Sequence, residues 1–523
     1  MTAPARAEVW FWPAAAAIAA AWLSWHIGWL PGHTLNAMRW TFYDQGSYLY
    51  ALGCWQSGEV LYRDIHWQYG PLALGWYRAF AAVLGNTPVA LATGSAVALG
   101  AAWMLFARLM WRTGGAWGAT LAVAGLLPAM TPPLLLSINI GPHGAIEALL
   151  VAVAATILPG SAASRARQLA LGAVAALLQW VRFGPHLVLI GAVGIVWLGE
   201  ALAARDGVRA AIIQTLRRAV PLLLAYAAGV LPLAAWYWLR LPPGGAAEVF
   251  WPAFMLGHYR SSYGAEDRWP SAGTAFEFAI TWLPALAAVA ASVAMLGRAR
   301  QRDGLPAGLL LATGYLVLGV LVLHRTRYAV LAHFWLAWPA LAWAGRESRH
   351  WRFAGAVLLA PILWHHAAGA WRTAREEKAW AAQPRVMPNG QALWMRPRDE
   401  EKLVRLAAEV GRIGAGRPVA VMVSGGGVHH FFGTRREGRH WWWYPGFVRP
   451  WERARAERDL LAHGHVLVVT AMQPDQPSAP GGALQLALPL TDDQTAALLP
   501  RLRNPRTIPG VGHLIEIAPG SEK

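Results

Sequence analysis

The sequence has very few residues that could cross-link it through covalent bonds or ion pairs. It contains one cysteine, Cys54, among 523 residues, which excludes an intramolecular disulfide and a cysteine-rich metal site. We expect Cys54 to be a small buried or interfacial residue. Only 14% of the residues are charged, whereas 56% are hydrophobic. A soluble protein rarely has this composition, and a polytopic membrane protein commonly does.

Acidic residues are especially scarce, with 28 Asp and Glu against 45 Lys and Arg, which gives a net charge of +17. Such a surplus can indicate nucleic-acid binding. Here the arginines fall in short connections between apolar segments rather than on one face of a domain, so we expect no nucleic-acid partner. The 31 Trp residues also favour a membrane protein, because Trp gathers at lipid–water interfaces.

The pattern of apolar segments predicts a polytopic α-helical membrane protein with about eleven transmembrane helices, since roughly 20 apolar residues span a bilayer. The segment at 70–85 is shorter, and we expect it to be an amphipathic or partly inserted helix. The first spanning segment reads as a signal-anchor that remains in the protein. The segments of spanning length are 10–30, 87–107, 116–134, 143–159, 168–182, 185–202, 219–240, 279–297, 305–323, 328–345 and 353–370.

The arginine-rich connections predict how the chain is oriented. If the N-terminus is cytoplasmic, each connection on the cytoplasmic side carries at least two arginines, as the positive-inside rule requires. We therefore expect a multi-pass membrane protein with a cytoplasmic N-terminus. Its outer face would carry the first loop (residues 31–86), a long loop (241–278) and a short one (324–328). The cytoplasmic connections would be 108–115, 160–168, 204–218, 297–304 and 345–352.

Residues 371–523 are predicted to form a small extracytoplasmic α/β domain beyond the transmembrane domain of residues 1–370. Polar stretches with helical spacing alternate there with short apolar runs that resemble buried strands. The glycines within 423–433 lack phosphate-loop spacing, so we expect a tight turn. The aromatic run at 440–447 is either a sugar platform or a surface that docks onto the membrane. The expected strands are 418–424, 465–471, 484–490 and 513–519.

Two carboxylates in the first loop, Asp44 and Asp64, are candidate catalytic residues. A carboxylate beside a membrane is costly to desolvate unless it has a proton, metal or cation as partner. Asp44 could instead cap the helix that follows it, and Asp64 could form a structural pair with Arg63 or Arg78. The two acids together, among aromatic and polar residues, favour a membrane enzyme over a channel or scaffold.

The order of residues in the first loop resembles that of the C-type (GT-C) membrane glycosyltransferases. These include the protein O-mannosyltransferases and the bacterial aminoarabinose transferases of lipid A, which are similar to glycosyltransferase family 39. The close match covers about thirty residues, and the many-helix layout extends it over most of the chain. Gln45 stands where members often have a second acid, and Gly70–Pro71 replaces a Pro–Pro turn. The matching residues are Asp44, Gly58, Tyr62, Arg63, Asp64, Gly70, Pro71 and Leu72.

The resemblance implies a hexosyl- or pentosyltransferase that uses a polyprenyl-phosphate sugar. The sugar would pass to a glycan, lipid or protein acceptor of the cell envelope, on the extracytoplasmic face of the bacterial cytoplasmic (inner) membrane. An acceptor hydroxyl is a weak nucleophile, so Asp44 is expected to be the general base. Asp64 would support the acceptor or a metal. A divalent metal ion, with Asp44 and Asp64 as ligands, is the one cofactor that the resemblance implies.

Cations on the outer side are expected to stabilise the departing lipid phosphate, and arginine has a planar fork that matches phosphate. Arg325 and Arg327 are the first candidates, followed by His324, His333 and Arg182. A purely structural interpretation is that these side chains snorkel to the membrane interface. However, the arginines lie on the expected outer side, against the positive-inside trend. The expected substrate-binding residues are Tyr62, Arg63, His66, Gln68, His258, Tyr259 and Arg260.

Four alternatives remain open at this point. The loop around 257–270 could be only a solvated connection, and His143 with Glu147 could be a metal pair or simply a satisfied histidine. A transporter or flippase for a lipid-linked sugar predicts ionisable residues at mid-membrane and an inverted repeat, and the sequence has few of the former and no repeat. A non-catalytic envelope scaffold would not need both Asp44 and Asp64.

Overall fold

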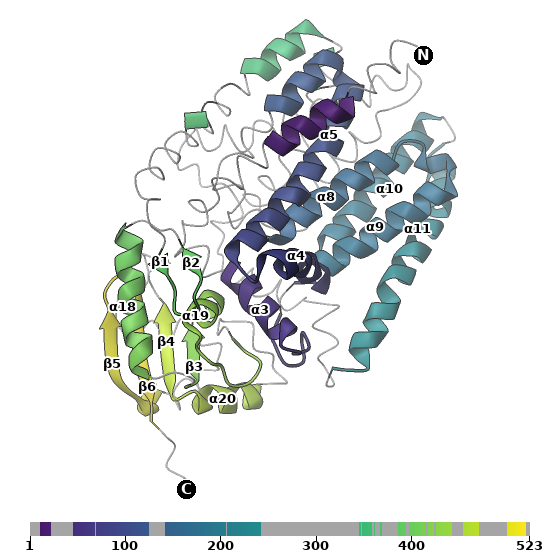
Figure 1. Cartoon of the computed structure of the whole chain (residues 1–523). Coiled ribbons are helices and arrows are strands. Elements are labelled where there is room, and N and C mark those ends of the chain that lie inside the picture. The colour runs from purple at the N-terminus through teal and green to yellow at the C-terminus, as the bar shows by residue number, and fades with distance from the viewer. Residues whose placement is uncertain are drawn as a thin grey trace.

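The protein combines a bundle of apolar helices with a smaller part that contains a β-sheet (Figure 1). A computed structural model describes residues 11–21, 45–67, 69–124, 142–204, 207–241, 385–393, 397–413, 417–422, 425–441, 453–469 and 499–518, with parts of 342–368. The helices of the first loop and of the bundle are α3 (Gly46–Gln56), α4 (Pro71–Leu84), α5 (Pro88–Ala124), α8 (Pro142–Ile157), α9 (Arg165–Val181), α10 (Pro185–Ala203) and α11 (Gly207–Trp238).

Several predicted spans coincide with described helices. Three described helices are long and apolar enough to cross a bilayer: Pro88–Ala124, Pro185–Leu202 and Gly207–Trp238. A helix is the natural solution there, because lipid offers no partner to backbone N–H and C=O groups. The expected spans 279–297, 305–323 and 328–345 lie outside the described residues, and 353–370 is only partly described. The number of spans therefore stays a prediction.

Helix α5 corrects the expected connection at 108–115. The helix continues through this stretch and breaks at Gly115, whose φ is 60°. The chain then turns back, since Trp103 Nε1 donates to the carbonyl of Ala122 at 2.8 Å, 19 residues later. The arginines predicted in a loop thus lie at the end of a helical hairpin. A helix continues here because every backbone group stays bonded until the glycine permits the reversal.

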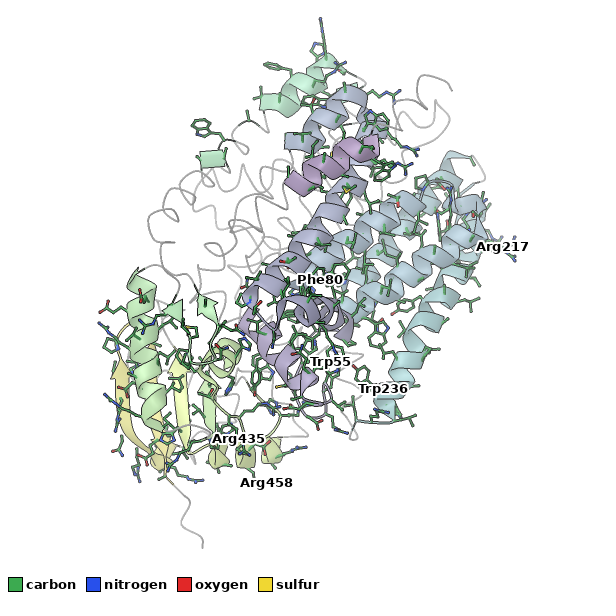
Figure 2. The ribbon with its side chains drawn as sticks, viewed as in Figure 1. Trp55, Phe80, Arg217, Trp236, Arg435 and Arg458 are labelled. Atoms are coloured by element: carbon green, nitrogen blue, oxygen red, sulfur yellow. The ribbon has the colours of Figure 1, made fainter. Side chains whose placement is uncertain are left out.

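Contacts sort the described connections into the two ends of the bundle. At one end Arg346 Nη1 reaches the carbonyl of Thr113 at 3.5 Å, and the rings of Phe11 and Trp111 stack at 5.0 Å. Two of the arginine-rich connections therefore lie together with the N-terminal helix. Helix α11 carries an arginine and a tryptophan towards opposite ends. Figure 2 shows Arg217 towards one end of this helix and Trp236 towards the other.

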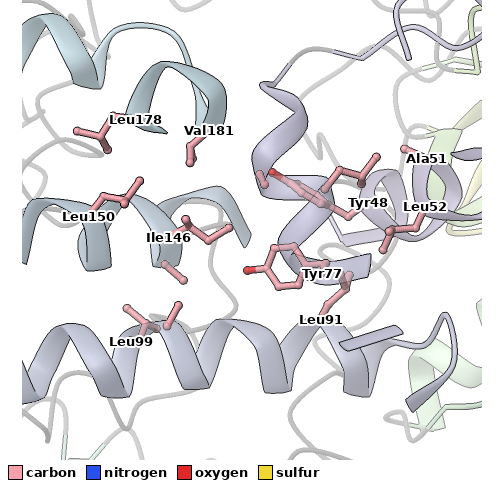
Figure 3. Close-up of a cluster of buried hydrophobic side chains, with 14 of the residues drawn as sticks. Tyr48, Ala51, Leu52, Tyr77, Leu91, Leu99, Ile146, Leu150, Leu178 and Val181 are labelled. Atoms are coloured by element: carbon pink, nitrogen blue, oxygen red, sulfur yellow. The ribbon is translucent and has the colours of Figure 1, made fainter. Parts of the chain in front are cut away.

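Helices α3 and α4 of the first loop cover the other end of the bundle. Tyr48 and Tyr77 are fully buried there, beside apolar side chains of α5, α8 and α9 (Figure 3). The Tyr77 hydroxyl forms a 2.8 Å hydrogen bond with Ser95 Oγ, which satisfies both polar groups. Helix α4 has 14 residues, or about 21 Å at 1.5 Å per residue. That is shorter than a bilayer core of about 30 Å, in agreement with the expected short helix at 70–85.

A four-stranded mixed sheet follows the bundle, in the order β3-β4-β6-β5. Strands β3 (Val419–Met422) and β4 (His465–Val469) are parallel, and β6 (Gly512–Ile517) pairs antiparallel with both β4 and β5 (Leu502–Ile508). Three of the expected strands are confirmed, and 484–490 lies outside the described residues. Around the sheet lie α18 (Pro397–Ile413), α19 (Gly425–Phe432), α20 (Arg453–Ala462) and the small hairpin β1 (Arg385–Val386) with β2 (Ala392–Leu393).

The glycine run after β3 forms the start of α19 rather than the expected tight turn. The helix packs on α3 of the first loop. A Cβ atom at Gly426 would lie 2.5 Å from the Cα of Ser47. Glycine is needed because the two helix backbones approach too closely for a side chain.

We predict that Gly426→Ala weakens the packing of α19 on α3. Overpacking of this kind lowers the free energy of unfolding by about 1–3 kcal/mol. Thermal unfolding of the detergent-solubilised protein, followed by Trp fluorescence, would show a lower Tm. Gly411→Ala in α18 is the matched control, since a Cβ there meets open space and alanine favours a helix. Equal behaviour of the two variants would contradict the prediction.

Candidate active site

The structure describes part of the predicted site. Tyr62, Arg63, Asp64, His66 and Arg182 are described. The roles of the other predicted residues stay predictions, since these residues lie outside the described ranges: Asp44, Gln68, His258, Tyr259, Arg260, His324, Arg325, Arg327 and His333.

The Tyr62–Arg63–Asp64 motif forms a strained turn. Tyr62 is buried and has a φ of 69°, which is uncommon for a bulky residue. Its N–H donates to the carbonyl of Ile65 at 2.8 Å, and its hydroxyl donates to the carbonyl of Tyr69 at 2.6 Å. The ring meets that of Tyr237 on α11 edge to face at 5.1 Å. Such a conformation persists only when the surroundings hold it firmly.

Asp64 braces this turn through its neighbour Arg63. Arg63 Nε donates to Oδ1 at 2.8 Å and Nη2 donates to Oδ2 at 2.7 Å, while the Val60 N–H also donates to Oδ2 at 2.8 Å. The hydrogen bonds from Arg63 hold the pKa of Asp64 below its ordinary value. The structural pair is therefore with Arg63, and Arg78 instead lies over the Trp55 ring.

A metal ion fits poorly at Asp64 in this arrangement. Both carboxylate oxygens already accept from a guanidinium, which a divalent ion would have to displace. Within the described part of the chain, no three side chains of His, Cys, Asp or Glu come together as metal ligands. Since Asp44 lies outside that part, metal dependence stays a prediction, and we assign no step of the reaction to a metal.

The other end of the first loop lies against α9 and α8. The Gly70 N–H donates to the carbonyl of Val181 at 2.9 Å, and a Cβ at Gly70 would collide with the backbone of Trp180. Arg182 follows directly and points its Nη1 at Nε2 of His143, 3.4 Å away. The Gly70–Pro71 turn thus places a cation beside the end of the first loop.

Aromatic side chains stack on His143, the residue that contacts this cation. The rings of Tyr69 and His143 stack at 4.3 Å, and Tyr48 stacks on Tyr69 at 5.8 Å. His143 Nε2 faces a donor, so its ring is a neutral acceptor at that atom. Its Nδ1 is buried without a hydrogen-bond partner among the described residues. Of the two readings for His143, the contact with Arg182 favours a histidine held by neighbours.

A segment after α19, residues 435–441, docks onto the first loop, and we call it the docking segment. The His66 N–H donates to the carbonyl of Arg439 at 2.9 Å, and Arg439 Nη1 donates to the carbonyl of Tyr62 at 2.5 Å. Trp441 Nε1 donates to the carbonyl of His66 at 2.6 Å. Trp441 is buried, so this member of the aromatic run serves neither as an exposed platform nor as a membrane surface.

An ion pair joins the docking segment to the start of the same loop. Arg436 is almost completely buried and pairs with Glu59. Tyr50 and Cys54 of α3 lie close by, and burial raises the pKa of the Cys54 thiol to about 11. The expected burial of Cys54 is confirmed. Glu59 is half-buried, so its removal would leave the more deeply buried Arg436 without this partner.

Sequence reasoning missed the docking segment and the aromatic stack on His143. One signal was available, because three arginines lie close together in the chain at 435, 436 and 439. The contacts themselves could not be found, because the docking segment and the first loop are far apart in the chain.

Comparisons with known proteins support the fold. No protein-family model matches the chain, and no curated protein sequence matches it. ArnT from Cupriavidus metallidurans, in a crystal structure with bound undecaprenyl phosphate, has the same fold with a TM-score of 0.52. The match covers 97% of both chains at 13% sequence identity. The chain has the fold of a C-type membrane glycosyltransferase. The resemblance found in the first loop is confirmed at the level of the fold.

We predict that docking of the C-terminal part weakens in acid. His429 and His463 lie beside the docking segment, where burial lowers the pKa of His429 to about 3 and that of His463 to about 4. His463 Nε2 accepts from the N–H of Glu437 and so must be unprotonated. The pKa values of both histidines in the folded protein lie below the ordinary 6.5. Their burial therefore costs no free energy of unfolding above pH 6.5, and the free energy of unfolding falls as the pH drops below that value.

The measurement is thermal unfolding between pH 7.5 and 5. Each histidine is expected to cost up to about 2 kcal/mol at pH 5, from 1.36 kcal/mol per pKa unit. His429→Gln should make the Tm less dependent on pH. A Tm that rises or stays constant on acidification would contradict the prediction.

Proposed function

We propose that the protein is a membrane glycosyltransferase that moves a sugar from a polyprenyl-phosphate carrier to an acceptor of the cell envelope on the extracytoplasmic face. The observation that carries this proposal is the fold shared along 97% of the chain with ArnT, a protein solved with bound undecaprenyl phosphate. The resemblance of the first loop to the same class of enzymes supports it independently of the fold.

The geometry of the bundle supports the placement of the reaction. The first loop, the cation Arg182 and the docking segment lie together at the end opposite to the arginine-rich connections at Thr113 and Arg346. By the positive-inside rule, that arginine-rich end is cytoplasmic. The N-terminus is then cytoplasmic, and the sheet lies on the outer face of the bacterial inner membrane, where the carrier presents its sugar.

We assign the chemistry to residues of the first loop and to cations near it. Asp44 accepts the proton of the acceptor hydroxyl as the hydroxyl attacks the anomeric carbon. The bond from that carbon to the phosphate oxygen breaks, and the phosphate leaves with additional negative charge. Arg325 and Arg327, with His324, stabilise this charge. Asp64 braces the turn that contains Tyr62, and through this turn it supports the acceptor.

Arg182 is the described cation best placed to contact the donor phosphate. Of the described residues, only His143 lies within hydrogen-bonding distance of its guanidinium, which has five N–H donors. The buried Nδ1 of His143 beside it is a polar group without a described partner, and such groups are normally satisfied by a ligand or water. An anionic headgroup between the first loop and α9 would satisfy the guanidinium.

The first test of the proposal is sugar transfer by purified protein in nanodiscs, from a panel of radiolabelled polyprenyl-phosphate sugars. Loss of a general base lowers the rate by about 100-fold or more, so Asp44→Asn should nearly abolish transfer that the wild type performs. Arg325→Ala should also reduce it. If both variants transfer normally, these roles are wrong. Carrier binding without turnover in the wild type would favour a transporter or a scaffold.

A second prediction concerns Arg182. Arg182→Gln removes a charge-assisted contact worth about 1.5–3 kcal/mol, so the KM for the donor lipid should rise by about tenfold or more. Arg412→Gln is a matched control, since Arg412 is exposed on α18 and pairs with Glu409 of the same helix. An unchanged KM in Arg182→Gln would remove Arg182 from the donor site.

A further inference from the structure

The docking segment connects the sheet to the first loop. At its start, Arg435 forms a parallel bridge with Pro418, and the Val419 N–H donates to the carbonyl of Arg435 at 2.8 Å. At its end, Arg439 and Trp441 contact the backbone of Tyr62 and His66. A shift of the sheet would therefore move residues that hold the loop.

Arg439 holds the strained turn from both sides. Its own carbonyl accepts the N–H of His66, and its buried guanidinium donates to the carbonyl of Tyr62. These two loop residues enclose the turn. Both contacts are to backbone atoms, so they fix the path of the loop rather than the identity of its side chains. The left-handed φ of Tyr62 needs such constraint from outside the loop.

The pair of Arg436 and Glu59 acts at the start of the same turn. Glu59 precedes Val60, whose N–H donates to the Asp64 carboxylate. The loop is thus tied to the docking segment before the turn by an ion pair, and around it by backbone hydrogen bonds. A role in folding of the sheet alone would not require contacts that converge on three residues of the first loop, Glu59, Tyr62 and His66.

We propose that Arg439 and Arg436 are positioning residues, through which the C-terminal part holds the first loop in its working conformation. Neither residue needs to touch the substrate. The structural half of this proposal, that the two arginines hold the first loop in place, does not depend on which reaction the protein catalyses. Its consequence for catalysis rests on the proposed function, because it assumes that the first loop carries the catalytic carboxylate.

The structural half is tested by amide hydrogen exchange of the full-length protein in nanodiscs. Arg439→Ala should speed exchange of the peptide containing residues 60–66 by about tenfold, while the β5–β6 hairpin, 502–517, stays protected. Arg439→Lys should restore part of the protection, because a cation remains. Arg412→Ala, the matched surface arginine, should change neither peptide.

A second variant guards against unfolding of the sheet. If Arg439→Ala also speeds exchange of residues 502–517, the Glu59→Gln variant is used instead. This substitution lies in the first loop, so it breaks the ion pair with Arg436 without changing a residue of the C-terminal part. Faster exchange confined to the loop in Glu59→Gln supports the proposal. Unchanged exchange of 60–66 in Glu59→Gln, or in an Arg439→Ala protein whose sheet stays protected, overturns it.

The catalytic half is read from the split between kcat and KM. A positioning role predicts that Arg439→Ala lowers kcat by about 10–100-fold, because misplacement of a catalytic group by about 1 Å has that effect. The KM for the donor lipid should stay within about twofold, and Arg439→Lys should recover part of kcat. Unchanged kcat in Arg439→Ala overturns the catalytic half. A wild type without any transfer refutes the proposed function, while the exchange data still decide whether the loop is held.

Discussion

Arg439 joins two parts of the chain that lie 377 residues apart. Its carbonyl and its guanidinium each bind a backbone group of the first loop, one at His66 and one at Tyr62. Buried backbone groups must find partners, and Arg439 supplies them for the Tyr62 carbonyl and the His66 N–H. The shape of the first loop, and so the arrangement of the candidate site, depends on this docked arginine.

The membrane imposes the second constraint. Within lipid a chain must satisfy its own backbone groups, and the described apolar segments of spanning length are accordingly helices. The first loop lies at one end of the bundle, between α9 and α19. Two close backbone contacts fix it there: Gly70 against Trp180, and Gly426 against Ser47. Each glycine lets two backbones meet where a side chain would keep them apart.

Local patterns predicted much of the fold. Apolar length identified α9, α10 and α11, and the short apolar runs identified β3, β4 and β6. For Asp64 the sequence offered two structural partners, Arg63 and Arg78, and the turn around Tyr62 decided for Arg63. The patterns were misleading at α5, where a helix continues to Gly115, and at the glycine run of α19, where a helix replaces the expected turn. In both places tertiary packing decided the backbone path.

The sequence by itself predicted a chain with apolar helices long enough to cross a membrane, candidate catalytic acids in the first loop, and a smaller α/β part after the helices. These conclusions rest on periodicity, length and composition, which are local properties. Only the tertiary structure placed Arg182 beside His143, buried Trp441 against His66, and brought Arg436 and Arg439 to Glu59 and Tyr62. Hydrogen bonds and ion pairs between distant residues leave no periodic trace in the chain, because they depend on how the packed helices and the sheet are placed in space.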